Sequence, residues 1–214
     1  MRISPLGTTA LLFEAPGPAA LASQERIWAL ATEAETWPEI REAVPGMNSL
    51  MLSFVHPPRQ LAPMEARLRD AWGNGQPLQQ QGRVIDLPVV YGGESGPHLA
   101  DVVAHTRLSV DEVVELHAAP VYPVYALGSH PGYCYLGGMD PRLTTPRRRV
   151  PVMRIPGGAV SIGGSQTGVS ASDGPSGWNT IGSTSMCFFD PARSPPALLQ
   201  PGDAIRFHVE RVIR

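Results

Sequence analysis

The chain has 214 residues, and its 17 lysines and arginines nearly balance its 19 aspartates and glutamates, leaving a formal net charge of −2. This balance excludes a general electrostatic attraction to nucleic acid or to anionic membranes. Two cysteines are too few for a secreted disulfide scaffold, and no apolar stretch approaches the roughly 20 residues of a membrane span. The composition predicts a cytoplasmic protein with one large domain or two small ones.

The first 80 residues alternate between strand and helix patterns. Leu50, Leu52 and Phe54 alternate along one face of a strand, whereas Ile27, Leu30, Ala31 and Ala34 repeat at helical spacing. This alternation predicts a small α+β layer domain over residues 1–80. The expected elements are strands at 8–13 and 49–55, a helix that ends at Trp37-Pro38, and a helix at 63–72.

Residues 73–82 are polar and have no hydrophobic periodicity, which is typical of a linker. We therefore expect two separable domains, one over residues 1–80 and one over residues 81–214. The alternative is a long surface loop inside a single domain.

The second half is interrupted by many of the 23 prolines and 22 glycines, which favours short strands over long helices. Ser109 and Glu112 form a capping-box pattern at the start of a helix. Ile205, Phe207 and Val209 alternate with polar residues, as in a half-buried strand. The pattern predicts a barrel or a sandwich. The expected strands are 83–91, 121–127, 150–155, 159–162, 185–189 and 204–213, with helices at 97–105 and 110–119.

Residues 132–142 combine two tyrosines, Tyr133 and Tyr135, with the double glycine Gly137-Gly138. The glycines interrupt any strand and permit close backbone approach, while the tyrosines offer flat apolar surface with hydroxyl groups. The segment is therefore interpreted as an ordered binding loop. A packed turn between two strands is the alternative.

A second glycine-rich region contains Gln166-Thr167-Gly168 and, further on, Trp178 and Ile181-Gly182. These motifs, together with the Tyr133–Leu143 run, resemble the family that includes the B subunit of the bacterial 5-oxoprolinase, allophanate-hydrolase subunit 1 and the sporulation histidine-kinase inhibitor. The resemblance extends, in the same order, to residues 87–94 and 198–203. It therefore covers nearly the whole chain.

The resemblance implies a mainly-β, cyclophilin-like barrel for residues 81–214. It also implies a hydrolase subunit of an ATP-dependent 5-oxoprolinase, which converts 5-oxoproline to L-glutamate together with the A and C subunits. ATP is then bound in the hetero-oligomeric complex, and the chain is inactive without its partners. Two other branches of the family imply alternatives, which are a regulatory module that inhibits a histidine kinase and a subunit that processes allophanate or urea.

The sequence departs from the family pattern at several positions. Ser129-His130 precedes Pro-Gly where an aromatic and a small or polar residue are usual, and Ser176 replaces the first glycine before Trp178. Ser183 replaces the arginine that usually follows Ile-Gly, and Ser170-Ala171 stands where Tyr-Pro is common. These departures leave the choice among 5-oxoproline, allophanate and urea open.

Several polar residues in these segments are candidates for substrate or partner binding. Gln166 both donates and accepts hydrogen bonds, which suits an amide, lactam or urea group, and Thr167 adds a hydroxyl. Arg142 suits a carboxylate, although a structural bond to loop carbonyls is the alternative. Trp178 offers a flat face or a core position. The 163–168 turn is either a backbone N–H cradle for an anion or a plain hairpin.

Six histidines are scattered along the chain, and none has the i, i+4 spacing of a helical metal site, so no metal is expected. His105 and His117 are expected on helix faces. His130 directly precedes the aromatic loop, where a neutral imidazole can act as a base, and is the weak catalytic candidate.

Overall fold

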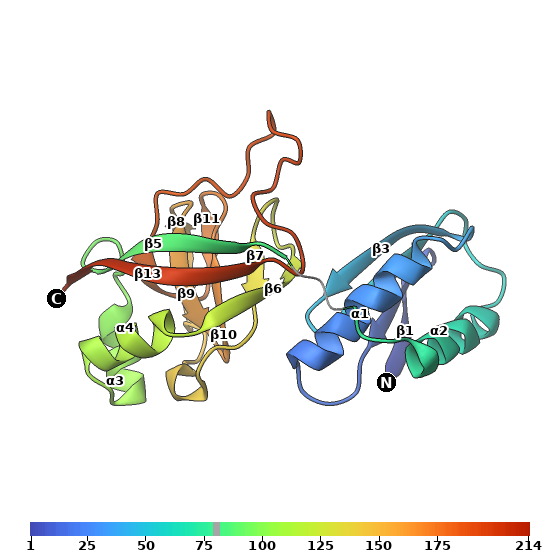
Figure 1. Cartoon of the computed structure of the whole chain (residues 1–214), viewed down its shortest axis with the longest axis horizontal. Helices are drawn as coiled ribbons and strands as arrows, with labels where there is room; N and C mark the ends of the chain where they lie inside the picture. Colours follow the sequence, from blue (N-terminus) through green and yellow to red (C-terminus); the bar gives the residue numbers. More distant parts are fainter. Residues whose placement is uncertain (79–81) are drawn as a thin grey trace. The chain divides into compact units, whose positions relative to one another are not determined.

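The computed structural model describes residues 1–78 and 82–214. The chain divides into two compact units, Met1–Gln81 and Gly82–Arg214 (Figure 1). Residues 79–81 of the expected linker lie outside the described residues, and residues 73 and 74 belong to a helix instead. None of the described helices is long and apolar enough to cross a membrane, the longest having 14 residues.

The N-terminal unit contains a four-stranded antiparallel sheet in the order β1-β2-β4-β3, with two helices packed against it (Figure 1). The expected helices and the strands near residues 8–13 and 49–55 are present. Two further strands were missed, because Pro5 and Pro45 argue against strand structure. Both prolines lie in edge strands, which tolerate the missing N–H. The elements are β1 (Arg2–Leu6), β2 (Ala10–Glu14), α1 (Leu21–Ala34), β3 (Ile40–Gly46), β4 (Ser49–Phe54) and α2 (Ala62–Asn74).

The core of the N-terminal unit follows from the apolar patterns in its sequence. Alternate residues of β2 and β4 face the helices, and the apolar stripes of α1 and α2 cover them. On the outside, the guanidinium of Arg26 lies 4.0 Å from the centre of the Trp72 ring, and that of Arg67 lies 4.1 Å from Trp37. The large side chains buried here include Leu11, Phe13, Ile27, Trp37, Leu50, Leu52, Phe54 and Leu68.

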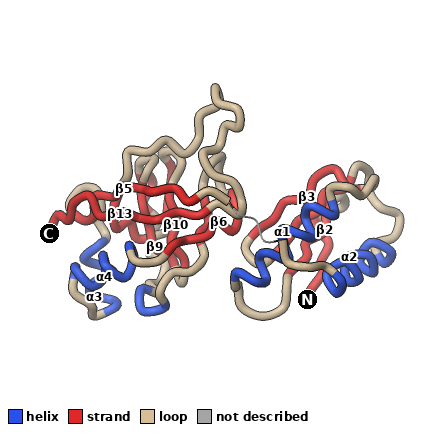
Figure 2. The backbone as a smooth tube through the Cα atoms, in the orientation of Figure 1, coloured by secondary structure: helices blue, strands red, loops and turns tan. Residues whose placement is uncertain are grey.

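The second unit is mainly β and is built on a closed barrel of seven strands in the order β10-β7-β6-β13-β5-β12-β9 (Figure 2). The sequence pattern left a barrel and a sandwich open, and the barrel is found. Its likeness to cyclophilin stays a prediction. The barrel strands are β5 (Val84–Gly92), β6 (Val121–Leu127), β7 (Cys134–Leu136), β9 (Ala159–Gly163), β10 (Gln166–Val169), β12 (Asn179–Ser183) and β13 (Ala204–Ile213).

Outside the barrel, β8 (Val152–Ile155) and β11 (Gly174–Ser176) form a two-stranded ribbon. Helix α3 (Leu99–Thr106) packs on β12, and α4 (Val110–Ala118) packs on β13. The predicted capping box is present at the start of α4, where Ser109 Oγ accepts the Glu112 N–H and the Glu112 carboxylate accepts the Ser109 N–H. A short 3₁₀ turn, Pro141–Leu143, follows β7.

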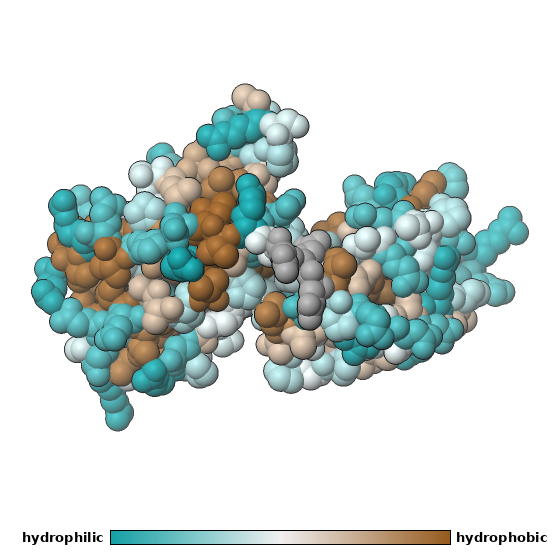
Figure 3. Space-filling view, in the orientation of Figure 1, coloured by the Kyte–Doolittle hydropathy of each residue, from teal (hydrophilic) through white to brown (hydrophobic). Residues whose placement is uncertain are grey.

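Three expectations for the second unit were wrong. The segment 132–142 is not entirely a loop, because Cys134–Leu136 forms strand β7 between β6 and β10. Residues 185–189 form no strand and contribute only an isolated bridge between Phe189 and Ala197. Val209 is 46% exposed, although Ile205 and Phe207 of the same strand are buried. Figure 3 shows apolar surface among the polar residues of this unit.

Candidate functional site

The barrel interior contains a hydrogen-bonded network centred on His117. This residue lies on α4, where its place beside Val113 and Val114 puts it on the buried face of the helix. Its Nδ1 is 2.8 Å from the hydroxyl of Tyr91, and its Nε2 is 2.8 Å from Oγ1 of Thr167. All three side chains are fully buried. His117 therefore lies on a helix face, as expected, and that face is the buried one.

The network fixes which nitrogen of His117 carries the proton. The hydroxyl of Thr167 donates to the carbonyl of Ser161, so its oxygen accepts from Nε2–H. Nδ1 then accepts the hydroxyl proton of Tyr91. Burial lowers the pKa of His117 to about 3, which keeps the ring neutral. The network links α4 to β5 and β10. None of its polar atoms is exposed, so it is not available to bind a ligand.

A cavity of about 100 Å³ at the barrel surface brings four of the predicted residues together. The Tyr133 ring lies 4.9 Å from that of Tyr135, 5.2 Å from that of His130 and 6.2 Å from that of Trp178. We call this the aromatic cavity. Its lining consists of Ser129, His130, Tyr133, Tyr135, Arg147, Ser170, Pro175, Ser176, Gly177 and Trp178.

Glycines beneath the rings shape the aromatic cavity. A Cβ on Gly163 would lie 2.5 Å from the Trp178 ring, and a Cβ on Gly168 would lie 2.8 Å from the Tyr133 hydroxyl oxygen. Neither position tolerates a side chain without displacing a ring. Gly132 turns the chain toward β7 with a φ of 80°. The glycines of this region thus seat the aromatic rings directly on barrel strands.

The electrostatics of the aromatic cavity favour a ligand with a polar group. Nε2 of His130 is buried and has no hydrogen-bond partner among the described residues. Buried polar atoms nearly always have a partner, so a water or a ligand atom is expected there. Burial lowers the pKa of His130 and raises that of Tyr133, so both are neutral near pH 7. Arg147 contributes the positive charge.

Other predicted binding residues lie away from the aromatic cavity. Arg142 is exposed and forms a bidentate ion pair with Asp140, whose pKa it holds down to about 2. It therefore bonds a carboxylate of its own turn. Gly137 is buried, and a Cβ there would lie 2.2 Å from the Tyr125 ring. Gly138 is exposed with a φ of 90°, a conformation that favours glycine.

The 163–168 segment is a β-hairpin turn that joins β9 to β10. Of the two alternatives, the plain hairpin is found, and the N–H of Gly164 donates to the carbonyl of Thr145. Gln166 is half-buried at the start of β10, and Thr167 points into the barrel toward His117. These two residues are therefore not part of the aromatic cavity.

Sequence reasoning missed Arg147 and Ser170 as cavity residues. Arg147 belongs to a basic run with Arg148, which pairs with Asp101. No local pattern distinguishes Arg147 from its neighbours, because the cavity is formed by segments distant in sequence. Within the described residues, no group of three or more histidine, cysteine, aspartate or glutamate side chains is placed to hold a metal ion.

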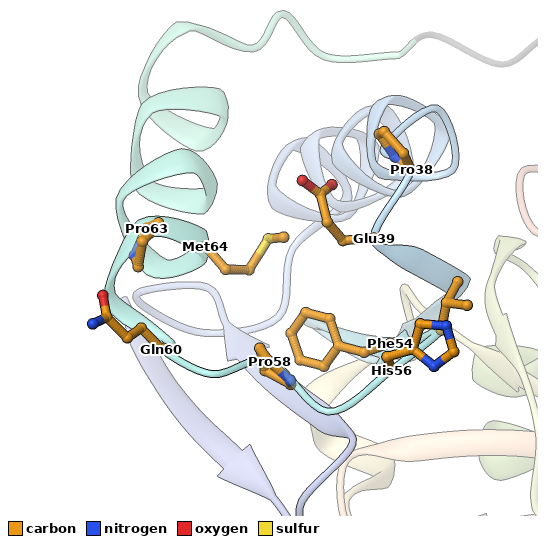
Figure 4. A pocket seen from close by; sticks show the side chains of 9 residues that line it. Pro38, Glu39, Phe54, His56, Pro58, Gln60, Pro63 and Met64 are labelled. Atoms are coloured by element: carbon orange, nitrogen blue, oxygen red, sulfur yellow. The ribbon is translucent and has the colours of Figure 1, made fainter.

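The N-terminal unit also has a cavity, of about 580 Å³, and its lining is mostly apolar. Figure 4 shows Phe54, Met64 and Glu39 reaching into it, with Pro58 at its edge. The Glu39 carboxylate lies 3.5 Å from the guanidinium of Arg67, so its charge is already paired. The cavity is large enough for a ligand, but its polar groups do not converge on one point as they do in most binding sites. It is therefore the weaker candidate site.

Comparison with known proteins agrees with this architecture. The family model described as the carboxyltransferase domain, subdomains C and D, matches residues 1–199. Urea carboxylase of Kluyveromyces lactis superposes with a TM-score of 0.78 at 18% identity, over 99% of this chain and 22% of that chain. At this identity the likeness shows the fold alone. The chain is thus built as a carboxyltransferase-type domain pair.

Two relatives cover nearly the full length. The B subunit of 5-oxoprolinase from Escherichia coli O157:H7 is 46% identical over 202 residues, which are 94% of this chain and 93% of that protein. A conserved uncharacterized protein of Pyrococcus horikoshii is 36% identical with a TM-score of 0.60, over 98% of both chains. The chain belongs to the family of 5-oxoprolinase B subunits.

Proposed function

We propose that this chain is a subunit of an ATP-dependent 5-oxoprolinase, a hydrolase that opens the lactam ring of 5-oxoproline to give L-glutamate. The observation that carries the proposal is the 46% identity to the B subunit of a 5-oxoprolinase over 94% of the chain. Because the match spans both units, it applies to the whole chain and not to one shared domain.

The chain acts within a hetero-oligomer that also contains A and C subunits, and it is inactive alone. Its Escherichia coli relative is itself one subunit of an enzyme, which supports this arrangement. The fold also recurs as 22% of the longer urea carboxylase chain, which is the relation expected of a domain that works beside others. Two unpaired cysteines, Cys134 and Cys187, fit the proposed cytoplasmic location.

ATP is a reactant in this proposal and is bound in the complex. The glycine-rich turn at 163–168 does not present an anion cradle, since the Gly164 N–H is bonded within the chain. The role left to this chain is to complete the site for the lactam or to position the partners.

The aromatic cavity is a surface through which this chain meets a partner subunit. Tyr135 and Trp178 supply flat apolar faces, and Arg147 supplies a cation suited to a carboxylate. The unpartnered His130 Nε2 supplies one polar contact, which positions a bound group without requiring proton transfer.

The proposal is tested by co-expressing this chain with the A and C subunits from the same genome and assaying ATP consumption with 5-oxoproline, allophanate and urea. We expect the three chains to co-purify and 5-oxoproline to give glutamate. Activity with allophanate or urea and none with 5-oxoproline would overturn the substrate assignment. Turnover of 5-oxoproline by the purified chain alone would overturn the requirement for partners.

A further inference from the structure

A second polar cavity lies on the barrel unit, apart from the aromatic cavity. Its volume is about 410 Å³, within the range of small-molecule sites. The loop between β5 and α3, the ribbon strand β8 and the barrel strand β12 enclose it. Its polar lining consists of Glu94, Ser95, His98, Arg154, Thr180 and Ser183. We call it the His98 cavity.

The loop that forms one wall of the His98 cavity is fixed by close backbone packing. A Cβ on Gly96 would lie 2.0 Å from the carbonyl oxygen of Ile181, and one on Gly92 would lie 2.0 Å from that of Ile213. The loop therefore rests directly on β12 and β13. A wall held in this way is formed before any ligand arrives, which lowers the entropic cost of binding.

His98 is the buried polar side chain of this wall, with 9% of its surface exposed. Its Nδ1 accepts the N–H of Thr180 at 2.9 Å, and its own backbone N–H donates to the carbonyl of Thr180. Because Nδ1 accepts, Nε2 carries the proton in the neutral ring. Burial and the charge of Arg148 lower the pKa of His98, which favours that neutral form. Nε2 makes no hydrogen bond to a described residue, so its N–H is available to a ligand.

The rest of the lining provides both donors and an acceptor. Ser95 and Ser183 contribute hydroxyl groups, and Arg154 contributes a guanidinium that uses Nε and Nη2 to bind Asp173. Glu94 contributes a carboxylate that accepts hydrogen bonds. The lining thus matches a small molecule that has a carboxylate and also an N–H, and its mixed charge disfavours a multiply charged anion such as phosphate.

The aromatic cavity and the His98 cavity differ in what they can hold. The aromatic cavity, at about 100 Å³, has room for a few waters or one functional group, whereas the His98 cavity, at about 410 Å³, has room for a whole small molecule.

We propose that the His98 cavity binds a small carboxylate that also carries an amide or amine N–H, with His98 Nε2–H and Ser183 donating to its oxygens and Glu94 accepting from its N–H. Under the proposed function, on which this inference rests, the ligand class includes 5-oxoproline and glutamate. His98 is then a substrate-binding residue that donates a hydrogen bond to the carboxylate, and it does not act as a base.

The test is a ¹H–¹⁵N NMR titration of the full-length chain with 5-oxoproline, with 2-pyrrolidinone, which has the lactam but no carboxylate, and with inorganic phosphate. We expect 5-oxoproline to shift the amide signals of Ser95, Thr180 and Ser183. The dissociation constant of 2-pyrrolidinone, which has no carboxylate, should be about tenfold or more higher than that of 5-oxoproline. Hydrogen bonds to a charged group usually contribute this much to binding. Shifts confined to the aromatic cavity, no shifts, or equal binding of phosphate would overturn the proposal.

Two variants make the test specific. His98→Asn keeps an acceptor near the Thr180 N–H but removes Nε2–H, and Ser183→Ala removes the hydroxyl donor. Both should raise the dissociation constant for 5-oxoproline by about tenfold or more. The matched controls are His208→Asn and Ser172→Ala, which make the same changes at exposed positions and should leave binding unchanged. Unchanged affinity in a folded His98→Asn chain would overturn the role of His98.

The outcomes separate this inference from the proposed function. If the assembled complex converts 5-oxoproline but His98→Asn changes neither its affinity nor its KM, the His98 cavity is not the substrate site while the function stands. If the complex does not convert 5-oxoproline and the cavity still binds small amide carboxylates, the binding site stands and the assigned reaction fails.

Discussion

The two units of this chain bury very different interiors. The N-terminal unit packs helices on a sheet through an apolar core, and its buried polar side chain Gln24 bonds to the backbone of Gly46 and Asn48. The barrel unit buries a histidine that joins two other side chains, together with a bonded pair formed by Ser161 and Thr180. Networks of this kind make a structure more specific, but they are costly when one member is lost.

The difference shows where recognition chemistry is concentrated. The cavity of about 580 Å³ in the N-terminal unit is lined mainly by apolar groups and a paired carboxylate. The aromatic cavity and the His98 cavity of the barrel unit each contain an imidazole with a ring nitrogen that has no partner among the described residues. Polar groups held by a rigid barrel are positioned for ligand binding, whereas the cavity of the N-terminal unit provides mainly apolar surface.

The sharpest test of this contrast is the loss of one buried polar side chain in each unit. His117→Ala should lower the free energy of unfolding by about 4 kcal/mol, because it leaves a cavity and removes the partner of Tyr91 and Thr167. Gln24→Ala should lower the free energy of unfolding by only about 2 kcal/mol. The backbone groups of Gly46 and Asn48 that Gln24 binds lie near a turn, where they can bond to water instead. Urea denaturation of both variants measures the two free energies of unfolding. Equal decreases in the two variants would contradict the proposed difference between the units.

The pH dependence of stability should also differ between the units. The pKa of His117 is about 3 in the folded barrel and near 6.5 when unfolded. The unfolded chain therefore binds a proton that the folded barrel excludes between those values. Barrel stability should be full above pH 6.5 and fall by about 1.4 kcal/mol per pH unit toward pH 3.

Amide hydrogen exchange at a series of pH values resolves this effect unit by unit. His117→Gln should remove the histidine contribution from the barrel. A decline of the same slope in that variant would show that His117 is not its cause.

Tyr135→Ala tests the aromatic cavity with a smaller expected effect on folding. The ring is half-buried and packs 4.9 Å from Tyr133, so its loss should lower stability by only about 1–2 kcal/mol while weakening assembly or activity of the complex. Tyr135→Phe is the control and should retain both. Size-exclusion chromatography and glutamate formation measure the outcome. A large fall in melting temperature with full activity in the folded fraction would make the residue purely structural.

Gly138→Val probes the same surface through the backbone. Gly138 has a φ of 90°, which a β-branched residue rarely adopts, so strain should disturb the turn after β7. Activity of the complex should fall several-fold. Gly174→Val is a useful control, because a Cβ there meets nothing within 4 Å and its φ is not in the left-handed range. Equal effects of the two substitutions would argue against a specific role for the Gly138 turn.

The smallest expected effect concerns the boundary between the units. Limited proteolysis should cut first between residues 75 and 82 and leave a folded C-terminal fragment, since the two units have separate cores. Mass spectrometry of the products identifies the site. Cleavage distributed along the chain with no stable product would contradict the prediction of separable domains.

Elements with a complete local pattern were predictable from the sequence. Helix α4 begins at its capping box, and strand β13 covers the expected range of 204–213. Strands β7, β10 and β12 were missed because they are short and contain or border glycines. Their pairing comes from distant segments, as it does for β13, which runs parallel to β5 although about 120 residues separate paired positions.

The candidate site was only partly visible in the sequence. His130, Tyr133, Tyr135 and Trp178 were predicted and do lie together. The role of His117 had a signal, since it continues the apolar stripe of Val113 and Val114 on α4. The position of Thr167 inside the barrel depends on strand register, which a single sequence does not specify.

The most direct measurement is an omission assay of the reconstituted complex. The A and C subunits are incubated with ATP and 5-oxoproline, with and without this chain, and glutamate and ADP are quantified together. We predict coupled formation of both products only when this chain is present, and a higher KM for 5-oxoproline with His98→Asn. Full glutamate formation by the A and C subunits alone would contradict the proposed function directly.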